Sequence, residues 1–261
     1  MFKHAIVRLP GSNFAHGLTT VEIGVPDLKT TMEQHAQYCA ALERCGLELT
    51  VLGADSEHPD STFVEDTAVL TEKVAVLTRP GAASREGEVH VMQDQLQRFF
   101  QRIEKIEAPG TLDGGDICEV GKHFFIGISR RTNQEGGRQL AAVLARAGYT
   151  SSFVDIRSME SILHLKSGIS YIGDNLLVVM EELAGRPEFK SQEFKGYDLL
   201  SVNPAESYAA NCVRVNDHVL VPVGYPLLAA ELLRRRYSVI ELEMLEFQKM
   251  DGGLSCLSLR F

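Results

Sequence analysis

The sequence lacks any long apolar run. No stretch approaches the roughly 18 consecutive apolar residues of a membrane-spanning helix. The first eleven residues, MFKHAIVRLPG, also lack an apolar run of signal-peptide length. We therefore expect neither a membrane partner nor an export signal.

Cysteine is sparse and unpaired in sequence. The odd number of cysteines and the absence of a CxxC pair argue against a disulfide scaffold or a structural zinc site. Two of them share one predicted helix at a spacing that does not suit a ligand pair, so packing roles are predicted for both. A reducing, cytoplasmic setting is the simplest interpretation. The five residues are Cys39, Cys45, Cys118, Cys212 and Cys256.

Positive charge is in deficit. The chain has 26 Lys and Arg against 35 Asp and Glu, a formal net charge of −9. This balance argues against a nucleic-acid binder that neutralises phosphates, and an acidic protein can favour cationic small molecules instead. The basic run Arg234–Arg236 ends a predicted helix, where cations complement the helix dipole, so a solvated face is the better interpretation. The chain also has no P-loop, no GxGxxG and no GxSxG motif.

What remains is the composition of a folded protein, with 44% hydrophobic and 23% charged residues. No low-complexity linker divides the 261 residues, so a single domain over 1–261 is predicted. Within it, a unit of strand, turn, strand, helix and strand recurs about every 45–50 residues, roughly five times.

The units follow from β-branched runs bounded by turn residues and from apolar spacing near 3.6 residues. The helix over 27–46 is an example, with Met32, Tyr38, Ala41 and Leu42 on its apolar face and a stop at Gly46. Strands are predicted over 2–10, 47–53, 62–70, 73–80, 103–109, 116–121, 123–129, 151–156, 238–243 and 254–261. Hairpins are predicted over 169–181, turning at Gly173-Asp174-Asn175, and over 212–223, turning at Asn216-Asp217; further helices are predicted over 89–100, 131–148 and 226–236.

Strands outnumber helices, whereas a doubly wound sheet has about one helix per strand. We therefore predict an α/β fold of five blades around a pseudo-fivefold axis, a propeller closed by pairing strands from the two termini. In such a ring the start of every blade lies near the axis. Polar residues at those starts then converge although they are far apart in sequence.

The blade starts carry the residue types of covalent catalysis on an electrophilic carbon in a cation, namely carboxylates, a histidine and a cysteine. Each has a plainer interpretation alone: Cys256 as a small buried hydrophobe, His164 as a satisfied core histidine, Glu65 and Asp66 as a solvated strand end. Recurrence at equivalent places is what favours a site. The starts are 63–66, 112–116, 164–168, 210–212 and 251–256.

These segments together resemble the dimethylarginine dimethylaminohydrolase family, within the guanidino-group-modifying (pentein) superfamily. The resemblance covers nearly the whole chain, and the family fold is a five-bladed α/β propeller. The matching stretches are FKHAIVRLP with HGLTT, PDSTFVEDTAVL, VLTRPGAASREGE, IEAPGTLDGGDICEVGKHFFIGISRRTN, LHLKSG, YAANC and KMDGGLSCLSLRF.

The resemblance implies hydrolysis of asymmetric N-dimethylarginine and N-monomethylarginine to citrulline plus dimethylamine or methylamine. By motif position it implies Cys256 as nucleophile, His164 as general acid/base and Asp113 as an acid that helps hold the guanidinium. The implied substrate contacts are Leu18, Asp60, Glu65, Asp66, Arg85 and Arg131, with a backbone contact at Met250.

The functional groups of these side chains fit the roles that the resemblance implies. Paired carboxylates bind a guanidinium bidentately, and Arg85 with Arg131 matches the α-carboxylate of an amino acid, while Asp60 meets its α-amino group. Positive charge from the substrate and from His164 is expected to lower the thiol pKa of Cys256. A loop over 12–20, with Gly11 and Gly17 as hinges, is a candidate lid. No metal or organic cofactor is required, the expected partner is a small cationic amino acid, and a homodimer stays open.

Two alternatives remain. An arginine or agmatine deiminase of the same superfamily would share the nucleophile, although agmatine has no carboxylate for Arg85 and Arg131 to bind. A non-catalytic binding protein, like the ribosome anti-association factor that shares the fold, would need no nucleophile. Discrimination between substrates by one or two methyl groups is worth only a few kcal/mol, so the sequence separates the first alternative weakly.

Overall fold

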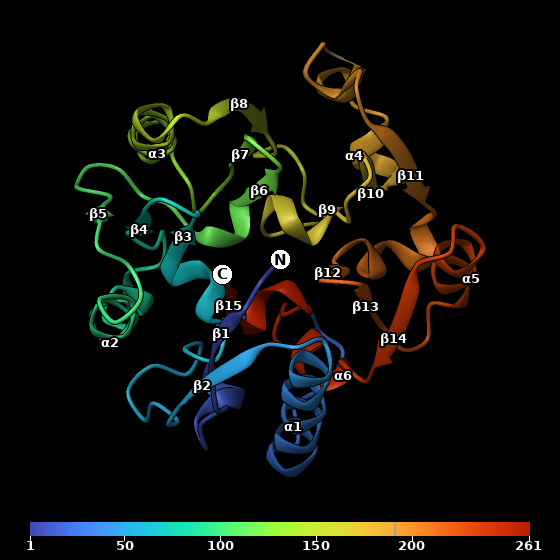
Figure 1. Ribbon diagram of the computed structural model, residues 1–261. Helices are drawn as coiled ribbons and strands as arrows, with labels where there is room; N and C mark the ends of the chain where they lie inside the picture. The colour runs from blue at the N-terminus through green and yellow to red at the C-terminus, as the bar shows by residue number, and fades with distance from the viewer. Residues whose placement is uncertain (191) are drawn as a thin grey trace.

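Five three-stranded sheets surround a central axis in the computed structural model, which describes residues 1–190 and 192–261 (Figure 1). In every sheet the middle strand pairs antiparallel with the inner strand and parallel with the outer one. The predicted five-bladed α/β propeller is therefore confirmed. Inner to outer, the blades are β3 (Ala68–Leu70), β4 (Ala75–Leu77) and β5 (Ile103–Lys105); β6 (Ile117–Val120), β7 (His123–Ile128) and β8 (Thr150–Asp155); β9 (Ile169–Tyr171), β10 (Leu176–Met180) and β11 (Asp198–Val202); β12 (Val213–Val215), β13 (His218–Pro222) and β14 (Ser238–Leu242); and β15 (Leu259–Arg260), β1 (His4–Arg8) and β2 (Glu48–Leu52).

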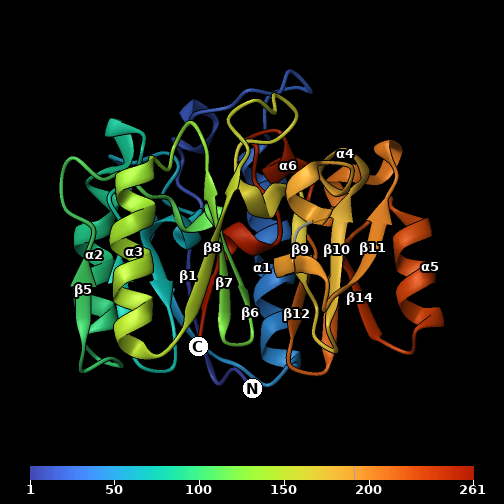
Figure 2. The ribbon, with the colours of Figure 1, turned by 90° about the horizontal axis from the view of Figure 1, so that it is seen from above.

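The last blade closes the ring with strands from both ends of the chain. Ala5 pairs with Arg260 and Ile6 with Leu259, antiparallel, as the sequence predicts. Both termini lie at one end of the axis, and the loop that follows β1 lies at the other end (Figure 2).

Middle strands are buried on both faces, which explains their continuous apolar sequences. All five residues of β10 are buried, whereas only the last residue of β11, Val202, is buried. Sheets covered on both faces favour such runs of Val, Ile and Leu. The hairpin turns use residues that tolerate positive φ: Gly173, Asp174 and Asn175 in one, and Asn216 in another.

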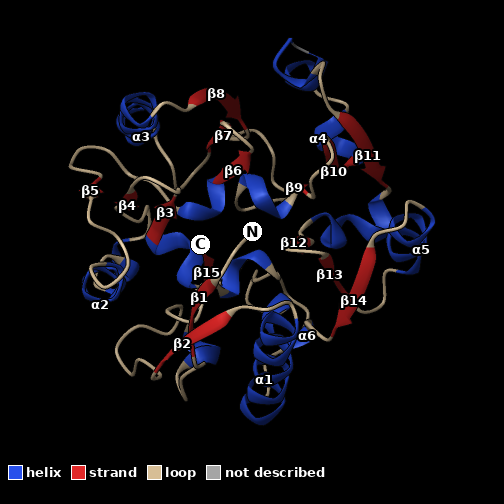
Figure 3. Ribbon diagram, in the orientation of Figure 1, coloured by secondary structure: helices blue, strands red, loops and turns tan. Residues whose placement is uncertain are grey.

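Helices cover the outer side of the ring, and short 3₁₀ turns gather around the axis (Figure 3). The helices are α1 (Leu28–Arg44), α2 (Glu88–Leu96), α3 (Gln134–Ala147), α4 (Glu181–Ala184), α5 (Pro226–Arg234) and α6 (Leu245–Gln248). No helix within the described residues is long and apolar enough to cross a lipid bilayer.

Three sequence expectations need correction. Met32 was expected on the apolar face of α1, but it is 36% exposed, and Thr31, Gln34 and His35 are buried beside Tyr38 and Leu42 instead. The segments predicted as strands over 62–70 and 254–261 begin with 3₁₀ turns, because their first residues curve into the axis before pairing starts. The blade from 169 onward also contains α4 and β11, which the sequence analysis did not predict.

Candidate active site

Four short turns at the axis carry the predicted chemical groups. They are η2 (Val64–Thr67), η4 (Gly114–Asp116), η5 (Leu165–Ser167) and η9 (Ser255–Leu257), each leading into the inner strand of a blade. Turns this close need glycine at the contact: a Cβ on Gly114 would lie 2.1 Å from the carbonyl oxygen of Glu65, and one on Gly115 would lie 2.8 Å from both Asp66 Oδ1 and His164 Nδ1. The two glycines of the DGGD motif therefore allow the approach of three blades.

His164 and Asp113 form a buried pair. His164 Nε2 lies 2.9 Å from Asp113 Oδ2, and the other carboxylate oxygen of Asp113 accepts the backbone N–H of Gly81 at 2.8 Å. Asp113 is fully buried and His164 is 6% exposed. Asp113 thus orients the imidazole.

Asp66 is a second carboxylate close to this imidazole. It accepts a hydrogen bond from the N–H of Gly115 and forms an ion pair with Arg85 Nη1 at 2.6 Å. Burial alone would raise the pKa of Asp66, but the charges of His164 and Arg85 outweigh it and lower that pKa. Burial conversely disfavours charged His164, yet Asp66 and the Asp113 hydrogen bond raise its pKa to about 9. His164 is therefore protonated at neutral pH.

Cys256 is half-buried, and its Sγ accepts the backbone N–H of Gly253 at 3.4 Å. Burial raises the pKa of its thiol to about 12, and the charges of Glu65 and Asp66 act in the same direction. In the free protein burial, with the charges of Glu65 and Asp66, outweighs the Gly253 N–H and Lys166, which lower this pKa. The expected effect of the substrate cation and of His164 stays a prediction. The resting group is a thiol.

Glu65 contacts side chains from the turns η5 and η9. Lys166 Nζ donates to its Oε1 at 2.6 Å, and Ser255 Oγ donates to its Oε2 at 2.7 Å. Arg260 adds an ion pair at 3.5 Å. Glu65 and Asp66 are adjacent in sequence, but they face different partners, Asp66 the imidazole and Glu65 the neighbour of the cysteine.

Arg85 is buried and engaged with the protein. It donates to Glu88 through Nε and Nη2, to Asp66 through Nη1, and to two backbone carbonyls. The charge of Glu88 helps to raise the pKa of Arg85 against the effect of burial. In this structure Arg85 holds Asp66 in place; its contact with substrate stays a prediction.

Asp60 fastens the loop that follows β1. Both of its carboxylate oxygens accept the backbone N–H of Leu18, and a Cβ on Gly17 would lie 2.4 Å from Asp60 Oδ1 and 3.3 Å from the Cε of buried Met250. The φ of Gly17 is −65°, which any residue adopts. Gly17 is therefore needed for close approach; its role as a hinge stays a prediction.

Arg131 is half-buried and close enough to Asp60 that its charge lowers the carboxyl pKa, although burial raises that pKa overall. Its guanidinium makes no hydrogen bond or ion pair to the rest of residues 1–190 and 192–261. Leu18, Asp60 and Arg131 therefore form one group of predicted site residues, and Asp66, Asp113 and His164 form a second, which Arg85 connects to the first through the Asp60 carbonyl and Asp66.

Several structural partners of these residues had no role assigned from sequence. Lys166 lies in LHLKSG, Ser255 in LSC, and Asp116, which accepts the N–H of Leu165, in the DGGD motif. Each lies within a few residues of a predicted site residue, and this proximity in the sequence could have indicated a role at the site. Glu88 gave no signal beyond its place three residues after Arg85.

One cluster within the described residues has the ligands and spacing to hold a metal ion, namely Asp66, Asp113 and His164, whose ligand atoms lie within 4.8 Å of one another. Each of the three already has a protein partner in the structure. Proton chemistry is therefore the better use of this cluster.

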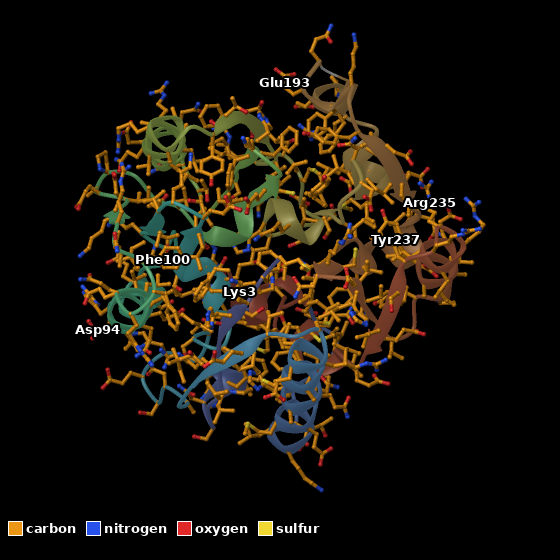
Figure 4. The ribbon with its side chains drawn as sticks, in the orientation of Figure 1. Lys3, Asp94, Phe100, Glu193, Arg235 and Tyr237 are labelled. Carbon is orange, nitrogen blue, oxygen red and sulfur yellow. The ribbon has the colours of Figure 1, made fainter. Side chains whose placement is uncertain are left out.

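A cavity of about 1270 Å³ occupies the other end of the axis, lined by the inner strands and both termini. Lys3 and Phe100 both line it; in Figure 4 Lys3 lies near the centre, whereas Asp94 and Arg235 lie at the rim of the ring. Glu65, Lys166 and Ser255 border the cavity, but Cys256, His164 and Asp113 do not. The ring of turns thus separates this cavity from the catalytic candidates.

A five-bladed ring with cysteine, histidine and carboxylates at its axial turns defines a guanidino-group-modifying hydrolase of the pentein class. The arginine deiminase family matches residues 56–203 of the chain. Dimethylarginine dimethylaminohydrolase of Pseudomonas aeruginosa is 44% identical over the full length of both chains, and that of Streptomyces coelicolor is 32% identical over 99% of this chain and 96% of the relative. The chain belongs to the dimethylarginine dimethylaminohydrolase family.

Solved structures agree with this membership. A cysteine-to-serine variant of the Pseudomonas aeruginosa enzyme, complexed with citrulline, superposes with a TM-score of 0.95 at 44% identity over all of both chains. The N-terminal domain of a cyanobacterial arginine dihydrolase gives a TM-score of 0.89 at 17% identity, covering 100% of this chain and 97% of that one, which shows the fold alone.

Proposed function

We propose that the chain hydrolyses asymmetric N-dimethylarginine and N-monomethylarginine to citrulline plus dimethylamine or methylamine. The observation that carries the proposal is buried His164, paired with Asp113 at 2.9 Å and flanked by Asp66, at the start of one axial turn, while another axial turn, η9, carries Cys256. The structure of the Pseudomonas aeruginosa relative with citrulline supports the same product.

The positive charge of the substrate would stabilise the thiolate of Cys256, which the free protein disfavours. Glu65 and Asp66 raise the pKa of the Cys256 thiol in the free protein. A guanidinium bound beside them would cancel that negative charge and place a cation next to the sulfur, so the thiol releases its proton to solvent and the thiolate forms when substrate binds. This mechanism limits the reactive thiolate to the loaded site.

The reaction then runs in two halves. The Cys256 thiolate attacks the guanidinium carbon, forming a C–S bond; the C–N bond to the dimethylamino group breaks, and the leaving nitrogen takes the proton of His164. Neutral His164 next takes a proton from water, which attacks the S-alkylthiouronium carbon. The C–S bond breaks, the departing thiolate of Cys256 takes the remaining proton of the added hydroxyl, and citrulline leaves from a site that again holds a thiol and an imidazolium.

The group of Leu18, Asp60 and Arg131 suits the amino-acid end of the substrate. Arg131 provides a guanidinium without a protein partner among the described residues, and Asp60 lies beside it. We assign Arg131 and Arg85 to the α-carboxylate and Asp60 to the α-amino group, with Leu18 and the backbone of Met250 closing the pocket. No metal or organic cofactor takes part in these steps.

The experiment measures citrulline, dimethylamine and ammonia released by purified protein from asymmetric dimethylarginine and, in parallel, from arginine. Equal citrulline and dimethylamine, with little ammonia from arginine, is the expected result. Cys256→Ala should abolish release, whereas Cys39→Ala, at the other half-buried cysteine, should not. Full turnover by Cys256→Ala would overturn the covalent mechanism.

Arginine deimination is the second candidate, because the arginine deiminase family matches residues 56–203. It would use the same cysteine and histidine with ammonia as leaving group. Ammonia from arginine at the higher rate in the same assay would select it.

A further inference from the structure

The axial turns are joined by a closed ring of hydrogen bonds, each linking one blade to the next. Gly115 N donates to Asp66 Oδ1 at 2.8 Å, and Leu165 N donates to Asp116 Oδ1 at 3.0 Å. Asn211 Nδ2 donates to the carbonyl of Lys166 at 2.8 Å, and Ser255 N donates to Asn211 Oδ1 at 2.9 Å. The bond from Ser255 Oγ to Glu65 Oε2, at 2.7 Å, closes the ring.

Asn211 is the residue in this ring that joins the turn of His164 to the turn of Cys256. Its amide nitrogen holds Lys166, two residues after His164, and also Ser255 Oγ at 3.1 Å. Its amide oxygen holds the N–H of Ser255, the residue before Cys256. One buried side chain thus fixes both turns at once.

The turn that carries Asn211 is itself held firmly. Asn211 follows η8 (Pro204–Ala210), whose last carbonyl accepts Ser170 Oγ at 2.7 Å, and the hydroxyl of Tyr208 donates to the Gly252 carbonyl at 2.8 Å. A Cβ on Gly253 would lie 2.6 Å from Asn211 Oδ1, so the glycine lets the nucleophile loop seat against the amide. These contacts on both sides hold the side chain of Asn211 in a fixed position.

We propose that Asn211 is a positioning residue that sets the nucleophile Cys256 against the acid/base His164. It reaches neither the thiol nor the imidazole, and acts through Ser255 and Lys166. A displacement of about 1 Å between reacting groups can cost about 100-fold in rate. Loss of Asn211 should therefore lower kcat and leave substrate binding, which other residues provide, largely unchanged.

Asn216 offers a matched control. Like Asn211 it uses Nδ2 to donate to two acceptors, the carbonyls of Phe2 and Cys45, and Oδ1 to accept one backbone N–H, that of Phe2. It lies in the β12–β13 turn at a φ of 53°, which Asp also tolerates. Changing either Asn to Asp removes two donors and keeps one acceptor.

The test compares Asn211→Asp, Asn211→Ala and Asn216→Asp with the unaltered protein in steady-state hydrolysis of asymmetric dimethylarginine. Both Asn211 variants should lose about 100-fold in kcat with KM within threefold, and Asn216→Asp should keep both constants within threefold. The Ala variant separates lost positioning from the added charge of Asp. Equal kcat in Asn211→Ala and the unaltered protein, or a loss in KM alone, would overturn the inference.

A double-mutant cycle between Asn211 and Ser255 tests whether the two residues act together on kcat, independently of any loss of stability in one variant. Ser255→Ala breaks the bond to Glu65 in the same ring, so its effect on kcat and that of Asn211→Ala should be far from additive. Additive effects would contradict a shared positioning role. The inference rests on the proposed hydrolysis, and the two fail differently: no turnover by the unaltered protein rejects the function, whereas unaltered turnover in the Asn211 variants rejects only the positioning role.

Discussion

Asp60 accepts the backbone N–H of Leu18 with both carboxylate oxygens, at 3.0 and 3.2 Å. This bond ties the loop after β1 to a residue proposed to hold the α-amino group of the substrate. The loop is also anchored by Phe14, which is buried against Phe63 and Phe247. Loop position and substrate binding are thus linked through one carboxylate.

Gly17→Ala is expected to weaken substrate binding. The new Cβ would lie 2.4 Å from Asp60 Oδ1, so the carboxylate or the loop must move. We expect KM for asymmetric dimethylarginine to rise about tenfold, as for a disturbed charged hydrogen bond. Gly53→Ala is the control, since no atom lies within 4 Å of its Cβ and its φ is not in the left-handed region. Equal KM values for the two variants would show that the loop does not depend on Asp60.

The pH profile of Cys256 alkylation should report the raised thiol pKa. Burial, Glu65 and Asp66 raise this pKa to about 12. The iodoacetamide rate in the free protein should therefore climb steadily between pH 7 and 10 without levelling, followed on the Cys256 peptide by mass spectrometry. Glu65→Gln should speed alkylation several-fold at pH 8, because it removes one of the charges that disfavour the thiolate. A plateau below pH 9 in the unaltered protein would contradict the resting thiol.

Much of the fold was predictable because it rests on local signals. β-Branched middle strands and turns such as Gly173-Asp174-Asn175 each mark their own element, and the repeat spacing then indicates five blades. The short helix α4 and the outer strand β11 were missed, because α4 has only four residues and β11 is half-exposed, so neither gives a strong periodic signal.

The site was less predictable, because its contacts join different blades. Lys166 reaches Glu65 across 101 residues of sequence, and Ser255 reaches it across 190. No local pattern states which blades meet, so motif positions predicted Glu65 as a substrate contact but not its protein partners. The raised pKa of the Cys256 thiol has the same origin, since its causes are burial and carboxylates from another blade.

His164 should make stability depend on pH between about 6.5 and 9. Its pKa rises from 6.5 to about 9 on folding, so its contribution is full below pH 6.5 and is lost as pH rises through 9. Asp113→Asn removes the paired carboxylate and part of this contribution. The difference in unfolding free energy between the two proteins, from urea titration, should shrink by up to about 1 kcal/mol per pH unit across this range. Asp174→Asn, at an exposed carboxylate paired with Arg214, should give a difference that does not change with pH. A constant difference for Asp113→Asn would rule out a contribution of Asp113 to the raised pKa of His164.

Arg131→Met should identify the end of the site that binds the amino-acid group. Among the described residues its guanidinium has no protein partner, so its loss breaks no ion pair and the effect falls on the ligand. We expect KM for asymmetric dimethylarginine to rise about 10- to 100-fold with a smaller change in kcat, because the α-carboxylate is remote from the reacting carbon. The adjacent Arg130 is exposed, its partner Glu160 lies 3.9 Å away, and Arg130→Met should leave KM unchanged. A substrate analogue without the carboxylate should bind equally to the unaltered protein and to Arg131→Met; discrimination between them would place the carboxylate elsewhere.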